Sequence, residues 1–157
     1  MSKAMTFRKP VEGRWIAQSG DLNRFLAVKE DTGGTYSQWE AIVPPGGGPP
    51  LHVHSREDES FFVLEGELVF QLGELRDTAV AGTYVSLPVG IPHCFHNESL
   101  AVARILITVV PGGLEGLFFE SGVEVEPGTT TAPPPAPDEK ERIRAGAQRY
   151  GIRLLHP

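Results

Sequence analysis

The sequence lacks the features of secreted and membrane proteins. Cys94 is the only cysteine among 157 residues, which excludes an internal disulfide and fits a reducing compartment. No segment approaches the roughly 20 consecutive apolar residues that a membrane-spanning helix needs. The N-terminus carries positive charge, but no apolar segment follows it, so it does not resemble a signal peptide. We therefore expect a cytoplasmic protein without a membrane partner.

Motifs of several large functional classes are also missing. The formal net charge is −6 at pH 7, and no cluster of Lys and Arg stands out, which argues against a nucleic-acid partner. The sequence has no dinucleotide-binding fingerprint, no phosphate-binding glycine loop and no pattern typical of a serine or cysteine triad. A small molecule is therefore the expected partner.

Glycine and proline are abundant. The chain contains 18 glycines and 14 prolines, and they fall between short apolar runs rich in β-branched and aromatic residues. This pattern is typical of an all-β protein whose short strands are joined by tight turns. A chain of 157 residues fits one such domain with a single core.

The C-terminal part has a different composition. Residues 123–137 are rich in proline and poor in large apolar groups, which predicts an extended linker. Residues 138–157 begin with the one good helix, with Asp138 as its N-cap and Glu141 placed to complete a capping box. We therefore expect an all-β domain over residues 1–122, a linker, and a short α-helix that packs on that domain or on a second subunit.

Two histidines and a carboxylate lie close together near the middle of the chain. His52 and His54 are separated by one residue, so on an extended strand both imidazoles project from the same side. Glu59 is five positions after His54, an odd offset that would place it on the opposite face of an unbroken strand. A bend or bulge within residues 55–58 is therefore needed to bring its carboxylate to the imidazoles.

A third histidine comes from a later stretch. His93 follows a β-branched and aromatic run that ends at Pro88 and Gly90. Three imidazoles and one carboxylate suit one divalent transition metal, namely Fe, Mn, Ni, Co, Cu or Zn. The sequence does not choose among these metals, because the affinity of such a site depends on metal availability and geometry.

The two stretches together resemble the two motifs of the cupin superfamily, and the nearest likeness is to small single-domain cupins of the quercetin 2,3-dioxygenase kind. The first motif reads Gly46-x5-His52-x-His54-x4-Glu59-x6-Gly66, and the second reads Gly82-x5-Pro88-x-Gly90-x2-His93-x3-Asn97. The resemblance implies a double-stranded β-helix, or jelly-roll barrel, in which His52, His54, Glu59 and His93 bind one metal. It also implies that Glu59 acts as a general base, and it favours a homodimer.

Four apolar residues are candidates for the substrate pocket. Phe61 and Val63 share the strand parity of Glu59, and Phe95 shares the face of His93. Phe118, in a segment that can form a helical turn, is placed to fold over an open end of the barrel.

Three residues near the motifs have simpler explanations than a role in the site. By strand alternation Cys94 and His96 point away from the face of His93. Arg104 is a candidate partner for an anionic substrate, but it is more simply a surface residue.

Several functions fit this site, because cupins carry varied chemistries. A metal with an open coordination position and an apolar pocket favours a dioxygenase acting on a small enol or phenol, such as a flavonol or a diketone. The alternatives are an isomerase or lyase, and a binding or sensor protein whose metal anchors a small ligand. A dioxygenase should consume oxygen during turnover, whereas an isomerase or lyase should turn over without oxygen. A binding protein should be stabilised by its ligand and form no product.

Overall fold

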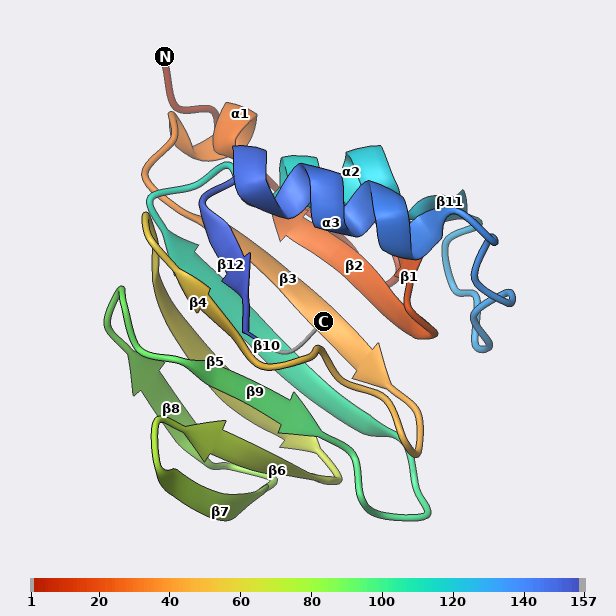
Figure 1. The fold of residues 1–157 in the computed structure, drawn as a ribbon. Coiled ribbons are helices and arrows are strands. Elements are labelled where there is room, and N and C mark those ends of the chain that lie inside the picture. Colours follow the sequence, from red (N-terminus) through yellow and green to blue (C-terminus); the bar gives the residue numbers. More distant parts are fainter. Residues whose placement is uncertain (1, 156–157) are drawn as a thin grey trace.

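The computed structural model describes residues 2–155 and confirms the all-β prediction (Figure 1). Two antiparallel sheets face each other and enclose a common interior. The first sheet contains, in spatial order, β11 (Val123–Val125), β1 (Trp15–Gln18), β2 (Asp21–Ala27), β3 (Ser37–Val43), β10 (Ala103–Val110), β5 (Asp58–Glu65) and β8 (Tyr84–Leu87). The second contains β12 (Ile152–Leu154), β4 (His52–His54), β9 (His93–His96), β6 (Glu67–Leu72) and β7 (Leu75–Val80).

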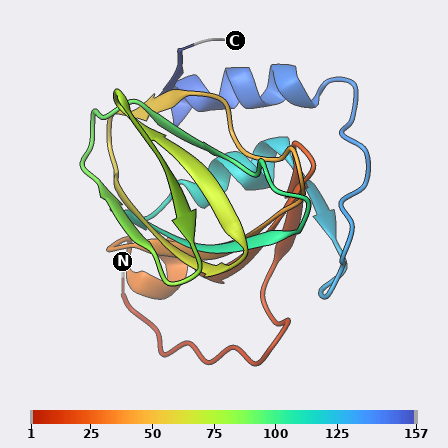
Figure 2. The ribbon, with the colours of Figure 1, turned by 90° about the horizontal axis from the view of Figure 1, so that it is seen from below.

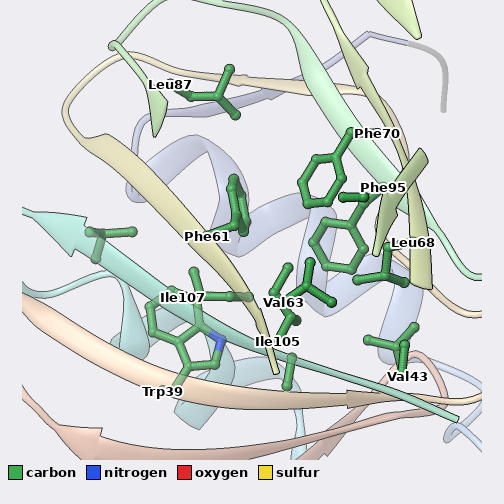
Figure 3. Close-up of a cluster of buried hydrophobic side chains, with 14 of the residues drawn as sticks. Trp39, Val43, Phe61, Val63, Leu68, Phe70, Leu87, Phe95, Ile105 and Ile107 are labelled. Atoms are coloured by element: carbon green, nitrogen blue, oxygen red, sulfur yellow. The ribbon is translucent and has the colours of Figure 1, made fainter. Parts of the chain in front are cut away.

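Strand alternation builds the core between the sheets. In β10 the buried residues are Ala103, Ile105, Ile107 and Val109, every second position, and the residues between them are less buried. Phe61 of the adjacent strand β5 and, from the other sheet, Phe70 of β6 and Phe95 of β9 belong to the same core cluster, which Figure 3 shows. The nearly continuous apolar run before Pro111 predicts a strand buried on both faces, but only one face of β10 is fully buried.

A glycine bend connects β3 to β4 and touches β9. The Gly46 N–H donates to the carbonyl of Asn97, and the Asn97 N–H donates to the carbonyl of Gly47. Gly48 has a φ of 125°, and a Cβ on it would lie 2.0 Å from the Phe95 carbonyl oxygen. Only glycine permits this close approach, so the bend fixes β9 beside the start of β4.

Three helices are present among residues 2–155: α1 (Lys29–Thr32), α2 (Glu115–Ser121) and α3 (Glu139–Arg149). Helix α3 was predicted, and α2 lies where the sequence predicted a helical turn. The sequence at residues 31–34 predicts a hairpin turn, but α1 occupies part of it, although β2 and β3 still pair antiparallel. Helices α2 and α3 pack side by side along one side of the barrel, as Figure 2 shows in teal and blue. Asp138 is the N-cap residue of α3, as predicted, but its side chain makes no capping hydrogen bond and instead accepts one from Arg142.

The segment predicted as a linker is partly a strand. Residues Val123–Val125 form β11 and pair with β1, so only the part after them is extended connection. After α3 the chain forms β12, which pairs with β4 and completes the second sheet. The predicted C-terminal segment therefore packs on its own barrel, and its last two positions, together with residue 1, lie outside the described residues. Among residues 2–155 no helix is long and apolar enough to cross a membrane.

Candidate metal centre

Four side chains from three strands converge in the barrel interior. His52 and His54 lie on β4, Glu59 on β5 and His93 on β9, and one ligand atom from each lies within 4.8 Å of all the others. Because opposite ligands of an ion bound at about 2.1 Å are about 4.2 Å apart, this spread is close to what one ion requires. His54, Glu59 and His93 are buried, and His52 is partly exposed.

The chain bends between the two histidines of β4 and Glu59, as the sequence parity requires. Residues 55–57 lie outside any strand, and β5 starts at Asp58, so Glu59 belongs to the opposite sheet from His54. His54 Nε2 lies 3.2 Å from Glu59 Oε2, and His93 Nε2 lies 2.9 Å from the same oxygen. The bend therefore brings the carboxylate between two imidazoles.

Backbone carbonyls orient two of the imidazoles. His52 Nδ1 lies 2.8 Å from the Pro50 carbonyl, and His93 Nδ1 lies 2.9 Å from the Ile91 carbonyl. A carbonyl only accepts hydrogen bonds, so both Nδ1 atoms carry the hydrogen. The Nε2 atoms then face the centre, where the neutral imidazole offers its lone pair to a metal.

The Glu57 carboxylate orients the third imidazole, that of His54. Its Oε2 lies 3.2 Å from His54 Nδ1, and its side chain is buried beside that histidine. Burial lowers the pKa of His54, but the carboxylates of Glu57 and Glu59 outweigh this effect and raise it to about 9. Sequence reasoning missed Glu57, although a carboxylate three residues after a ligand and inside the required bend was a usable signal.

The pKa values of the two other ligands follow from burial and neighbours. Burial and, to a smaller extent, the nearby His93 lower the pKa of His52 to about 4. Burial raises the pKa of Glu59, but the neighbouring imidazoles of His54 and His93 outweigh this effect and bring it to about 2. Near neutral pH the centre therefore contains an anionic carboxylate, a neutral His52 and a proton on His54.

These residues fit a divalent transition metal. His54 Nε2 is buried and has no hydrogen-bond partner, although a carboxylate oxygen lies nearby. Three imidazole nitrogens and a carboxylate oxygen are the donors such ions prefer, and a cation would occupy the place where a proton now balances the carboxylate.

The four side chains line a cavity of about 130 Å³ inside the barrel. Three predicted pocket residues also line it, namely Phe61 of β5, Phe95 of β9 and Phe118 of α2. Val63, the fourth, is fully buried in the core and is not among the lining residues. Most of the lining is apolar, so the centre faces a space suited to a small, partly apolar molecule.

Helix α3 forms part of the wall of this cavity. The sequence alone did not decide whether this helix packs on its own domain or on a second subunit. Ile143, Ala147 and Tyr150 recur at helical spacing and form an apolar stripe. Ile143 and Ala147 line the cavity wall together with Ile152 of β12. The stripe therefore packs on its own barrel. Its distance in sequence from the histidines explains why spacing alone did not connect it to the site.

Three other residues lie outside the cavity lining. Cys94 is buried with its Sγ 4.0 Å from Gln71 Oε1, and His96 is exposed. Arg104 pairs with Glu40 at 2.7 Å and with Glu65 at 3.4 Å. All three positions agree with the alternation of strand faces.

Comparison with known proteins places this site in a family. Residues 39–110, which include all four candidate ligands, match the family model described as the cupin domain. The chain is 30% identical over 117 residues to quercetin 2,3-dioxygenase of Bacillus subtilis, a match that covers 69% of this chain and 34% of the relative. It is 29% identical over 96 residues to the HTH-type transcriptional regulator PuuR of Escherichia coli, covering 61% of this chain and 46% of the relative.

A solved structure shares the fold. An RmlC-like cupin from Shewanella frigidimarina superposes with a TM-score of 0.62 at 16% identity, covering 71% of this chain and 96% of that one. The present chain spans about a third to a half of the curated relatives that it matches. The two facing sheets are thus the double-stranded β-helix, and residues 39–110 form a cupin domain.

Proposed function

We propose that the protein is a metal-dependent enzyme of the dioxygenase type that acts on a small enol or phenol, such as a flavonol-like or diketone-like compound. The observation that carries the proposal is that a His₃Glu cluster opens onto a mostly apolar cavity. The 30% identity to a quercetin 2,3-dioxygenase supports the reaction type.

His52, His54, Glu59 and His93 would hold one divalent transition metal. When bound, such a metal polarises an anionic substrate oxygen and provides a place for molecular oxygen beside it. The aromatic rings of Phe61 and Phe95 would hold a flat substrate against the centre and exclude water.

Glu59 would also take a proton from the substrate. Despite burial, the neighbouring imidazoles of His54 and His93 keep the pKa of its carboxyl low, at about 2. A bound divalent cation would also favour the carboxylate, so Glu59 would act as a base once it releases the metal. The proton of the substrate hydroxyl would pass to a Glu59 carboxylate oxygen, and the substrate would become an enolate or phenolate.

The test is oxygen consumption by the metal-reconstituted protein with a flavonol, a β-diketone and a catechol. We expect uptake with at least one of them, and its loss in Glu59→Gln while the exposed Glu67→Gln keeps it. Turnover without oxygen would contradict the proposal and would indicate an isomerase or a lyase.

A binding or sensor protein is the second candidate. The observation that favours it is the match to a transcriptional regulator over 46% of the length of that protein. A sensor would show a rise in melting temperature with its ligand and no product, because a ligand that binds only the folded state stabilises it. The same set of compounds therefore separates the two candidates.

A second copy of the chain is the partner that we expect to bind the outer surface of the barrel. β8 is an edge strand of the larger sheet, and Tyr84 on it and Phe62 beside it on β5 are exposed. Unpaired strand edges and exposed apolar side chains favour association, so we propose a homodimer. Light scattering on the eluting protein should give twice the chain mass, and a monomer mass would contradict it.

A further inference from the structure

Unpartnered polar atoms gather at one cavity. Within residues 2–155, four buried side-chain atoms have no hydrogen-bond partner: Asp21 Oδ1, Trp39 Nε1, His54 Nε2 and Arg142 Nε. The first three belong to residues that line the cavity of the metal centre. His54 is accounted for by the proposed metal, but Asp21 and Trp39 belong to neither the ligand set nor its supporting residues.

Trp39 carries the stronger signal of the two. Its side chain is only 2% exposed, and its Nε1–H can donate but not accept. A buried donor without a partner costs about 1–3 kcal/mol, so a cavity with such a donor is better satisfied when a ligand oxygen accepts from it. Figure 3 shows the indole nitrogen, in blue, turned toward the interior among the core side chains.

The other tryptophan shows that this arrangement is not general in the protein. Trp15 is 5% exposed, yet its Nε1–H donates to the Val11 carbonyl at 2.8 Å. Trp15 does not line the cavity. The two tryptophans thus have similar burial, but only Trp39 both lines the cavity and has an indole N–H without a partner.

Trp39, Asp21 and Asn23 form a polar wall of the cavity, on the sheet opposite the three histidines. Trp39 is on β3, where it pairs with Phe25 of β2, and Asp21 and Asn23 of β2 line the same cavity. β2 and β3 belong to the larger sheet, whereas the three histidines lie on β4 and β9 of the smaller one. A ligand between the sheets would therefore meet the metal on one side and the indole donor on the other.

Cavity size limits that ligand. The volume is about 130 Å³, close to the roughly 150 Å³ cavity that accommodates one benzene ring. Ile143 and Ala147 of α3 form part of the wall on one side. The cavity volume matches one ring and is smaller than a three-ring flavonol.

We infer that Trp39 is a specificity-determining residue whose indole N–H binds a second oxygen of the substrate, and that the substrate is a single-ring or similarly small enol or phenol with an oxygen function remote from its metal-binding oxygens. This inference rests on the proposed function and narrows its substrate class to small compounds. Asp21, with its own unpartnered oxygen at the same wall, adds to the polar character of that side.

The test is calorimetric titration of the metal-reconstituted protein without oxygen, so that binding is measured without turnover. The probes are catechol and its two formyl derivatives, 2,3- and 3,4-dihydroxybenzaldehyde. We expect at least one aldehyde to bind the protein about tenfold more tightly than catechol, which is the effect of one buried hydrogen bond.

Trp39→Phe should remove this preference, and Trp15→Phe should keep it. The electronic effect of the formyl group on the catechol oxygens is the same in all three proteins, so the change in the affinity ratio isolates the N–H. A ratio that Trp39→Phe leaves unchanged, or that Trp15→Phe lowers equally, would overturn the inference.

A comparison of ligands keeps the test decisive if Trp39→Phe does not fold. 4-(Trifluoromethyl)catechol also withdraws electrons from the ring but has no carbonyl oxygen, so the unaltered protein should bind it about tenfold more weakly than the preferred aldehyde. Equal binding, no binding of any probe, or tight binding of quercetin would overturn the inference. A probe that binds with the expected preference but is not oxidised in air would instead count against the dioxygenase proposal alone.

Discussion

At the residue scale, each histidine of the centre has one nitrogen committed to the protein and one left for a ligand. Pro50 and Ile91 supply backbone carbonyls to two of the Nδ1 atoms, so these contacts do not depend on a side chain. His54 depends instead on the carboxylate of Glu57. Only this third contact can be removed by substitution without changing a ligand.

Removing Glu57 should therefore weaken metal binding without removing a donor. We expect Glu57→Ala to lower the affinity for the metal about 10- to 100-fold, because the His54 ring loses its orientation and its more basic character. Glu57→Gln keeps an acceptor oxygen for the Nδ1–H and should lose much less. Competition with a chelator measures the affinities, and the exposed Glu67→Ala is the control. Equal affinity in Glu57→Ala and the unaltered protein would contradict this role.

Asp21 should make stability depend on pH. Burial raises the pKa of its carboxyl to about 7, although a hydrogen bond from the Gly48 backbone partly opposes this. Between pH 4 and pH 7 the unfolded chain releases this proton first, so the free energy of unfolding falls as pH rises, by at most about 4 kcal/mol, and levels off above pH 7. Asp21→Asn removes this fall.

Urea unfolding of both proteins with a chelator present measures the effect. The difference in unfolding free energy, variant minus unaltered protein, should increase from pH 4 to pH 7 and then stay constant. Titration of all other groups cancels in this difference. A difference that is the same at pH 4 and pH 8 would show that Asp21 titrates normally.

At the element scale, the glycine bend between β3 and β4 holds the two histidine strands together. Asn97, which follows β9, is buried and donates from Nδ2 to the carbonyls of Val43 and Ala101 at 2.9 and 2.8 Å. With the backbone bonds to Gly46 and Gly47, these contacts fix the end of β9 to the start of the bend. The glycine and asparagine of the two sequence motifs thus support the ligands without touching them.

Gly48→Ala should be much more damaging than an alanine at another glycine with positive φ. The new Cβ would lie 2.0 Å from the Phe95 carbonyl oxygen, so β9 must shift, at a cost of about 3 kcal/mol or more from strain and overpacking together. Gly73 has a φ of 61° and nothing within 4 Å, so Gly73→Ala should cost only about 1–2 kcal/mol. Denaturant unfolding measures both values. Similar losses would mean that the contact with β9 is relaxed cheaply.

What the sequence predicts well is governed by local periodicity. His52 and His54 lie on one face of β4 because side chains alternate along any strand, and the odd offset to Glu59 correctly required a break. The short strand Val123–Val125 was hidden by the proline-rich residues after it, since β11 forms only because β1 offers a partner edge. Likewise, no local pattern places Ile143 of α3 in the wall of a cavity whose ligands lie far away in sequence.

At the scale of the whole molecule, the candidate centre joins both sheets. Three ligands come from the smaller sheet, and Glu59 comes from the larger one. Helices α2 and α3 add a third layer, because Tyr150 and Arg149 both bond to Glu120 of α2, at 2.9 and 2.5 Å. A bound metal would thus add a direct link between strands of the two sheets.

Removal of the metal should therefore lower the stability of the entire domain in one transition. At a free metal concentration about 1,000 times the dissociation constant, binding contributes about 4 kcal/mol, which corresponds to roughly 10 °C in melting temperature for a chain of this size. His93→Ala should melt at the same temperature with metal or with chelator, because a ligand is lost. His96→Ala alters a neighbouring, exposed histidine on the same strand and should keep the full difference. If His96→Ala loses the difference as well, or if the unaltered protein shows none, the four converging side chains do not bind a metal that stabilises the fold.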